Sequence, residues 1–429
     1  MIQRPATRIV ERRSEGEGEV GTTALKGCRR ETHRTIAPEQ TLEKIAMSGL
    51  AGAAGITRVA NVTGLDAIGI HVVTVCRPNS RSLAVAQGKG ITLAAAKASG
   101  LMEAIELYIA ERPQLATYRA SYDEIRRSGE ALDPVELARP RTSWYRRNLP
   151  ILWVQGRDLA RGTPLFVPFD LVHMDWTLPL PTGSEIFSLT SNGLASGNHP
   201  MEAVSHAICE LVERDATTLF QRIPAAEKRR RRVALASIDT PECREALARF
   251  RSAGVCVAVW ETTSDIGIPC FLCMICEGSR GAFEALPPVG GEGCHPSRAI
   301  ALLRALTEAA QKRLTMITGS RDDLLYPEYA RRTDPHYIKV MSELIQSADG
   351  ERSFHTSPSR DFESCEQDVA WERERLASVG LKQVVSVELT SHECGIHVVR
   401  VLIPGLEAIH DLPGYVPGAR ARALSASFA

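Results

Sequence analysis

The distribution of apolar and polar residues predicts three long helices in which glutamates stand among alanine, leucine and isoleucine. These segments are residues 91–112, 199–222 and 297–317. Residues three or four apart in such a segment share one face of the helix. Proline supports two of the limits, because Pro113 follows the first segment and Pro200 stands in the first turn of the second.

Shorter segments complete the pattern. Helices are predicted at residues 38–50 and 366–378, and strands at residues 58–62, 69–75, 151–155 and 165–168. Three β-prone strings share one form, Gly-Ile followed by a small or polar residue and apolar pairs, and begin at Gly69, Gly267 and Gly395. They indicate either an internal duplication or three similar strand starts. Strands alternate with long helices without the regular spacing of parallel crossovers, which predicts an α+β fold.

The glutamates in the long helices are the main candidate for chemistry. Glu103 and Glu106 form one pair with helical spacing, and Glu210 and Glu213 form another. A single pair of this kind usually lies on a solvated helix face, but two pairs within apolar helices favour a site. Clustered carboxylates repel one another unless a cation neutralises them, and Mg²⁺ with a nucleotide phosphate is the usual partner. The pattern therefore predicts a magnesium–nucleotide site.

Glycine-rich segments precede two of these helices and are predicted to be loops. They are residues 87–90 and 191–198. A glycine-rich loop that enters a helix presents backbone N–H groups to phosphate. Neither segment contains the GxxxxGK[ST] motif, and GxGxxG is also absent, so a nucleotide would bind in neither of those common ways.

At these residues the chain resembles the YcaO family. The resemblance rests on QGKGITLAAAKASGLMEAIELY, SNGLASGNHPMEAVSHAICELVERDA, RALTEAAQKRL and KGCRRETHRTIAPEQTLEKI, and covers roughly residues 26 to 420. It implies an α+β fold of mixed and antiparallel sheets flanked by helices, with the nucleotide between the glutamate helices, and commonly a homodimer. It also implies ATP and Mg²⁺ as cofactors, and phosphorylation of a peptide backbone amide oxygen after a nucleophile adds to the carbonyl.

The resemblance carries over residue by residue. The Mg²⁺ ligands that it implies are Glu103, Glu106, Glu210 and Glu213. The ATP-binding residues are Arg34, Thr41, Lys89, Asn198, Glu202, Arg214, Arg304 and Glu308, with the part played by Lys89 the least defined. Basic side chains near the phosphates would stabilise the charge that develops in phosphoryl transfer. No side chain need become a covalent nucleophile, so none is named as catalytic.

The reaction itself leaves alternatives open. Azoline-forming members of the family often end in PxPxP, whereas this chain ends in ALSASFA. Its closing region, IPGLEAIHDLPGYVPGARARAL, resembles members that work with a TfuA-type partner, a group tied to thioamide formation. We therefore expect thioamidation of a ribosomally made peptide, with a TfuA-like protein or a sulfur donor as a partner. Azoline formation on Cys, Ser or Thr is the alternative, and a non-catalytic scaffold that binds nucleotide or peptide is the second.

Composition agrees with a globular enzyme. The chain has 429 residues, of which 44% are hydrophobic and 24% charged, and its formal net charge is zero, which gives no indication of nucleic-acid binding. No apolar run is long enough to span a membrane and no secretory signal is visible, so we expect a cytoplasmic protein. We expect residues 1–30 to be a flexible tail and residues 31–429 to form one YcaO domain.

Two further motifs have ordinary explanations. Cys270, Cys273 and Cys276 form a CxxCxxC string, but its apolar neighbours predict a buried strand, on which thiols three apart point to opposite faces and cannot converge. We expect a structural role for them, with a sulfur relay as the lesser alternative. The basic run at residues 228–232 is expected to be a solvated junction between a helix and a strand rather than a nucleic-acid contact.

Overall fold

The strands form three antiparallel sheets with helices packed on them. The computed structural model of the protein describes residues 23–179, 186–278, 286–321, 323, 326–390, 395–411 and 414–428. One sheet contains β1 (Arg58–Asn61), β2 (His71–Cys76) and β3 (Val85–Gly90), and another contains β8 (Val255–Glu261), β9 (Cys270–Glu277) and β10 (Val289–Cys294). The largest contains β4 (Tyr118–Ala120), β5 (Ile151–Asp158), β6 (Pro164–Pro168), β7 (Leu194–Gly197), β11 (Val385–Glu388) and β12 (His397–Leu402). This arrangement confirms the predicted α+β class.

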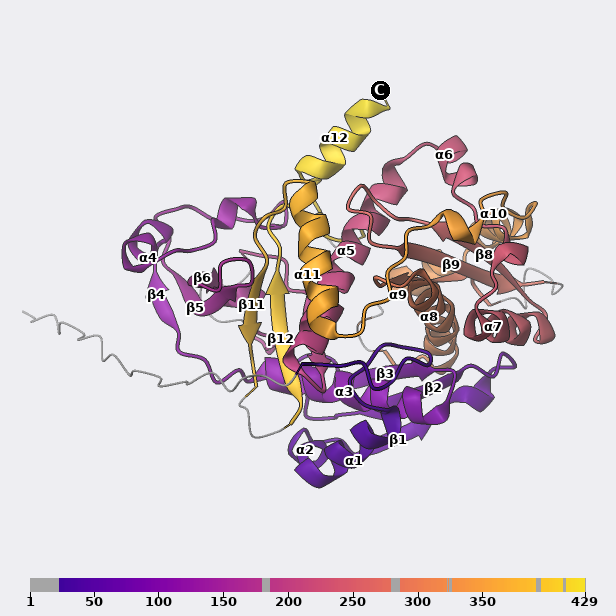
Figure 1. Ribbon diagram of the computed structural model, residues 1–429, viewed down its shortest axis with the longest axis horizontal. Coiled ribbons are helices and arrows are strands. Elements are labelled where there is room, and N and C mark those ends of the chain that lie inside the picture. Colours follow the sequence, from indigo (N-terminus) through magenta and orange to yellow (C-terminus); the bar gives the residue numbers. More distant parts are fainter. Residues whose placement is uncertain are drawn as a thin grey trace, which may run out of the picture.

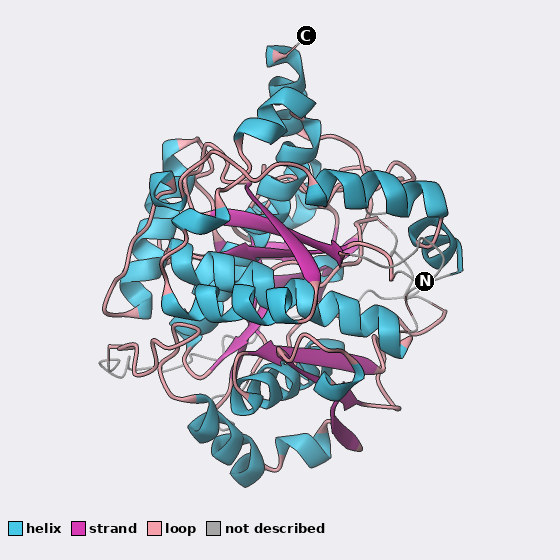
Figure 2. Cartoon of the chain, turned by 90° about the vertical axis from the view of Figure 1, so that its right-hand side faces the viewer, coloured by secondary structure: helices cyan, strands magenta, loops and turns pink. Residues whose placement is uncertain are grey.

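The three predicted glutamate helices are present and dominate the interior. They are α3 (Leu93–Glu111), α5 (Pro200–Arg222) and α8 (Arg298–Thr318), which differ from the predicted limits by one or two residues. The remaining helices are α1 (Pro38–Ser48), α2 (Leu50–Ala53), α4 (Tyr122–Ser128), α6 (Ala225–Arg230), α7 (Pro241–Ser252), α9 (Tyr326–Arg332), α10 (Pro335–Gln346), α11 (Cys365–Ser378) and α12 (Ala419–Ser427). Figure 1 shows α5 and α11 beside β11 and β12, with α12 projecting from the body, and Figure 2 shows helices lying across the strands.

The prediction of glycine-rich loops was wrong for residues 87–90 and for half of residues 191–198, because strands lie there, whereas residues 191–193 do form a turn. Residues 87–90 belong to β3, and residues 194–197 form β7. The glycines serve the packing of each strand against the helix that follows it. A Cβ on Gly88 would lie 2.0 Å from the carbonyl oxygen of Ala96 and 2.1 Å from the amide nitrogen of Gly100, both in α3. Only glycine allows the two backbones to come so close.

The three Gly-Ile strings begin the middle strands of three similar units. β2 lies between β1 and β3, β9 between β8 and β10, and β12 between β11 and β7. Each string starts with a glycine of positive φ, which is 75° at Gly69, 77° at Gly267 and 63° at Gly395. Each unit therefore consists of a flanking strand, a Gly-Ile strand, a small-residue strand and a glutamate helix. This common order supports an internal repeat.

The register of the strands extends the repeat to the helices. Gly90 pairs with His71, and Gly197 pairs with His397. In the β9–β10 unit the amide nitrogen of His295 donates to the carbonyl oxygen of Pro269 at the corresponding place. The spacing from Gly90 to Glu103, from Gly197 to Glu210 and from His295 to Glu308 is the same. Glu103, Glu210 and Glu308 consequently occupy equivalent positions in the three units.

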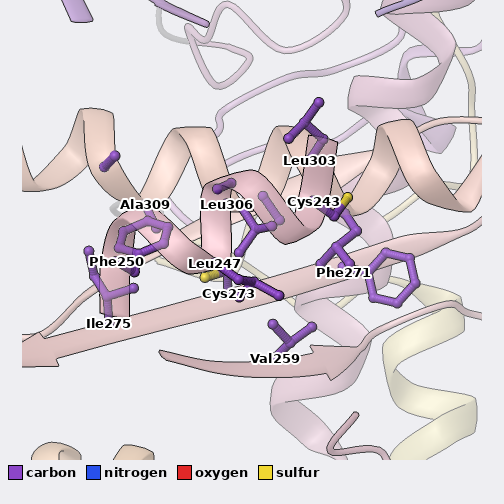
Figure 3. Close-up of a cluster of buried hydrophobic side chains, with 14 of the residues drawn as sticks. Cys243, Leu247, Phe250, Val259, Phe271, Cys273, Ile275, Leu303, Leu306 and Ala309 are labelled. Carbon is purple, nitrogen blue, oxygen red and sulfur yellow. The ribbon is translucent and has the colours of Figure 1, made fainter. Parts of the chain in front are cut away.

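One large part of the core lies between α7, α8 and the β8–β10 sheet. Figure 3 shows side chains such as Phe250, Leu306 and Ile275 meeting there, with Cys273 among them. The CxxCxxC string lies on a buried strand, β9, as predicted. Its other two thiols belong to different clusters, since Cys270 packs with α5 and Cys276 with the end of α10. The three thiols therefore do not converge.

Residues 23–37, which we call the N-terminal segment, pack across the start of α11. The ammonium of Lys26 lies 2.7 Å from the carboxylate of Asp368, and both side chains are almost fully buried. The amide nitrogen of Ala24 donates to Glu366 over 2.8 Å. Of the predicted tail, residues 1–22 lie outside the described residues, whereas the part from residue 23 onward is held against the body by these contacts.

Two predictions concern the surface. In the basic run, Arg229 and Arg230 are exposed, but Arg232 is buried and donates to the carbonyl oxygens of Leu344 and Ile345. The run is therefore a solvated junction only in part. Within the described part of the chain, no helix is both long enough and apolar enough to cross a lipid bilayer.

Candidate nucleotide site

A strand of each unit contacts the glutamate helix of another unit. Lys89 of β3 lies 2.6 Å from the carboxylate of Glu308 on α8. Glu292 of β10 accepts a hydrogen bond of 2.7 Å from Arg214 on α5. Ser196 of β7 donates to Glu106 on α3 over 2.9 Å. We call the units that contain α3, α8 and α5 the first, second and third. The three contacts therefore join the first unit to the second, the second to the third and the third to the first.

Of the four carboxylates predicted as metal ligands, Glu213 is buried and Glu103, Glu106 and Glu210 are half-buried. Burial raises the pKa of Glu103 to about 7, although Arg321 and Lys89 oppose the rise. Burial, followed by the charge of Glu210, raises the pKa of Glu106 well above its usual range. Desolvation and repulsion make the ionised form of these carboxylates unfavourable, and a nearby cation would stabilise that form.

The pKa values of the two carboxylates on α5, Glu210 and Glu213, are raised in the same way. Burial raises the pKa of Glu210, and it raises that of Glu213 to about 7 against the opposing charge of Arg214. The guanidinium of Arg214 lies 3.3 Å from Glu213 and 3.9 Å from Glu210, and these carboxylates together with Glu292 raise its pKa despite its burial. Arg214 thus neutralises part of the acidic cluster but is shared among three carboxylates.

Glu308 differs from its equivalents Glu103 and Glu210. Burial opposes its ionisation, but Lys89, Lys312 and Arg214 together hold its pKa far below the usual range. Lys89 and Lys312 both contact its carboxylate, at 2.6 and 3.0 Å. Glu308 therefore stays ionised and holds two ammonium groups at the edge of the cluster.

A second group of predicted residues gathers around Glu202 at the start of α5. One oxygen of Glu202 accepts from the backbone and side chain of Thr35, each over 2.8 Å, while the other accepts from the backbone of Asn198. The amide of Asn198 donates to the hydroxyl of Thr41 over 3.1 Å. Arg34 lies 3.6 Å from Glu202. The N-terminal segment therefore contacts the start of α5 through Arg34 and Thr35.

Arg304 connects the two groups. Its guanidinium contacts Nε2 of His206 on α5 over 2.7 Å, and burial together with this cation lowers the pKa of His206 well below its usual range. A small pocket lies beside the Glu202 group and is lined by Arg34, Glu202, His206, His295, Arg304 and neighbouring residues. Of the twelve predicted residues, Arg34, Glu202 and Arg304 line this pocket. The other nine belong to the two groups that Arg304 connects.

Sequence reasoning missed Glu292 and His206. Glu292 lies in VGGEGC, a glycine-rich string before a glutamate helix, so it has the same context as the segments before α3 and α5. Gly291 and Gly293 on either side press against α8, which leaves Glu292 directed toward Arg214. His206 follows Glu202 by one helical turn and could have been found by its shared face.

The donor set suits a hard divalent cation. Among the residues that the structure describes, no three Asp, Glu, His or Cys side chains lie close enough together to form a complete metal site. The carboxylates of α3 and α5 are nevertheless near enough to raise one another's pKa, and their oxygens are the ligands that Mg²⁺ prefers. A cation among them would relieve the repulsion, so the residues fit Mg²⁺.

Related sequences align with most of this chain. Residues 87–407 match the family model described as YcaO cyclodehydratase, ATP- and Mg²⁺-binding. The chain is 38% identical over 366 residues to the "Uncharacterized protein in tfuA 3'region" of Rhizobium leguminosarum bv. trifolii, covering 84% of this chain and 85% of that protein. It is also 33% identical over 381 residues to a protein of Methanothermobacter thermautotrophicus, covering 87% of this chain and 95% of the other.

Solved structures share the fold at lower identity. A heterocyclase in complex with substrate and cofactor superposes with a TM-score of 0.75 at 24% identity, over 95% of this chain, which spans 56% of the heterocyclase. YcaO from Methanopyrus kandleri bound with AMPPCP and Mg²⁺ superposes with a TM-score of 0.71 at 23% identity, over 92% of this chain and 99% of the other. The resemblance seen in the sequence is confirmed, and the chain belongs to the YcaO family, which binds ATP and Mg²⁺.

Proposed function

We propose that this protein uses ATP and Mg²⁺ to activate a peptide backbone amide and, with a TfuA-like partner or a sulfur donor, converts that amide to a thioamide. The observation that carries the reaction type is the 38% identity to a protein of a tfuA 3′ region over most of both chains. The buried carboxylate cluster supports the use of a nucleotide and a divalent cation.

The proposed roles follow from the contacts within the site. Glu103, Glu106, Glu210 and Glu213 would hold Mg²⁺, which when bound supplies positive charge to the triphosphate. Asn198, Glu202, Arg34 and Thr41 would hold the nucleotide, because they are linked through one hydrogen-bonded group. Arg214, Arg304 and Lys89 would face the phosphates, and Glu308 would orient Lys89 and Lys312.

The reaction that this site would support has a defined balance. Hydrosulfide adds to the amide carbonyl, and the amide oxygen takes the terminal phosphoryl group of ATP. Phosphate then leaves with that oxygen, and the proton that sulfur carried is lost to solvent. The products are thioamide, ADP and phosphate. The chain's basic side chains would stabilise the charge on the transferring group, so that no covalent bond to the protein is required.

Azoline formation is the second candidate, and it is favoured by the family description and by the fold shared with a heterocyclase. Mass spectrometry of a candidate peptide incubated with ATP, Mg²⁺ and the TfuA-like partner separates the two. Exchange of sulfur for oxygen raises the mass and is the result that we expect. Loss of water from a peptide modified at Cys, Ser or Thr would replace our proposal with the azoline reaction.

Nucleotide binding is tested first, by calorimetric titration with AMPPCP in the presence and absence of Mg²⁺. We expect Mg²⁺-dependent binding by the wild-type protein and its loss in a Glu210→Gln/Glu213→Gln variant. Glu374→Gln is a matched control, because Glu374 is an exposed helical glutamate on α11 and should leave binding unchanged. A wild-type protein that binds no nucleotide even with its partner would favour the scaffold alternative.

We also propose that the protein acts as a homodimer in the cytoplasm. Light scattering of the purified protein should give twice the chain mass of 46.8 kDa. A monomer at micromolar concentration would count against the dimer without affecting the assignment of the site.

A further inference from the structure

Arg400 on β12 is a buried arginine at the edge of the acidic cluster that the family resemblance does not include. Its side chain is 2% exposed. Nε donates to the carbonyl oxygen of Leu171 and Nη2 to that of Thr190, each over 2.5 Å. The remaining nitrogen, Nη1, is buried and has no hydrogen-bond partner among the residues that the structure describes. A buried donor without a partner is costly and calls for an explanation.

The side chain of Arg400 points toward the proposed metal ligands. β12 and β7 are paired, with Val398 opposite Ser196 and Arg400 opposite Leu194. Residues two apart on a strand share a face, as do residues directly opposite on paired strands, so Arg400 and Ser196 lie on the same face of the sheet. Ser196 donates to Glu106 from this face. Arg400 therefore lies on the face of the sheet from which Ser196 contacts α3, two residues along β12 from the position opposite Ser196.

The charges around Arg400 agree with this placement. Burial lowers its pKa to about 10, while Glu210 and Glu106 oppose the change. The guanidinium thus remains positive at neutral pH. Its charge interacts with both carboxylates. Among the residues that the structure describes it nevertheless forms no ion pair with either, unlike Arg77, which is buried against Glu111 at 2.6 Å. Within the described part of the chain, Nη1 is therefore the nitrogen of this guanidinium that remains to donate to an anionic oxygen.

We propose that Nη1 of Arg400 binds an oxygen of the terminal phosphoryl group of the nucleotide. Arg400 would approach that group from β12, whereas Arg214 and Arg304 would approach from α5 and α8. The two carbonyl contacts fix the plane of the guanidinium, so that one N–H pair stays directed into the site. The inference rests on the proposed function, since it requires that a nucleoside triphosphate binds there.

The test compares two nucleotides that differ by the group in question. AMPPCP and ADP are titrated with Mg²⁺ into the wild-type protein and an Arg400→Gln variant by calorimetry. We expect the variant to lose about tenfold to hundredfold in affinity for AMPPCP, the value of one charge-assisted hydrogen bond, while its affinity for ADP stays within about twofold. Arg232→Gln is the control, because Arg232 is also a buried guanidinium held by carbonyl oxygens but belongs to the α10 region.

The possible results separate this inference from the proposed function. If Arg400→Gln lowers the affinity for AMPPCP and for ADP equally, or lowers neither, Arg400 has a structural role only and the inference is overturned. Equal affinity of the wild-type protein for AMPPCP and ADP would do the same. Failure of the wild-type protein to bind either nucleotide would count against the proposed function. If Arg400→Gln does not fold, Arg400→Lys replaces it, because lysine keeps the buried charge but cannot make all three contacts. The affinities of Arg400→Lys for AMPPCP and ADP are then compared in the same way.

Discussion

Glu103 and Glu308 occupy equivalent positions in two of the repeated units, but their pKa values shift in opposite directions. Burial raises the pKa of Glu103, whereas Lys89 and Lys312 hold that of Glu308 down. The difference arises from the basic side chains rather than from the backbone, which is the same in both. The position of a carboxylate is thus set by the repeat, and its protonation by the neighbours that differ between units.

Glu372 on α11 offers a test of buried charge outside the proposed metal ligands. Burial raises its pKa to about 8, and one of its oxygens accepts from Ser205 over 2.6 Å. Between pH 4.5 and 8 the folded state therefore binds a proton that the unfolded chain has lost. The free energy of unfolding consequently falls as the pH rises through this window.

We expect Glu372→Gln to remove this pH-dependent fall in the free energy of unfolding, because glutamine keeps the shape of the side chain without the charge. The variant should be more stable than the wild type by about 4 kcal/mol at pH 8.5 and by less than about 1 kcal/mol at pH 5. Urea unfolding at the two pH values measures the difference. The exposed Glu374→Gln serves as the control, and an unchanged pH dependence in Glu372→Gln would contradict the burial argument.

At the scale of elements, the sequence predicted the helices well and the strands that precede them poorly. Helical spacing of the glutamates located α3, α5 and α8 because that pattern is local. The strings before α3 and α5 were taken for loops because glycine is rare in strands. Their glycines are explained by contacts with the following helix, as at Gly88, and composition alone does not contain that information.

Gly291 on β10 should be intolerant of a side chain for the same reason. A Cβ there would lie 2.2 Å from the carbonyl oxygen of Ala305 and 2.3 Å from the amide nitrogen of Ala309, both in α8. We expect Gly291→Ala to lower the free energy of unfolding by about 3 kcal/mol or more, because backbone atoms must move. Gly52→Ala on α2, where no atom lies within 4 Å, should change it by less than about 1 kcal/mol. Equal stability of the two variants in urea would show that α8 can shift freely.

At the scale of the whole molecule, the site depends on all three units. Lys89, Glu292 and Ser196 each reach a helix of a different unit, so the site forms only when the three are assembled. The sequence located the glutamates and the basic residues around Glu202 because the family motifs are long. It did not identify Glu292 or Arg400, since what distinguishes them is the element that they face after folding.

Nucleotide should therefore stabilise the whole chain rather than one part of it. With Mg²⁺ and AMPPCP at a hundred times the dissociation constant, we expect about 2.7 kcal/mol of added stability. A single thermal transition that moves upward with nucleotide concentration, observed by calorimetry, would agree with one assembled site. Two transitions of which only one responds would show that the units unfold independently.

The third unit is built from distant parts of the chain, and this has a consequence for synthesis on the ribosome. The first two units are each continuous, from β1 to α3 and from β8 to α8, but β7 must wait for β12, with which it pairs through Gly197 and His397. While translation continues, α5 carries its glutamates without a complete sheet beneath them. Contacts between such remote segments form late, so a chain that stops before β12 would contain every proposed metal ligand and still lack the site.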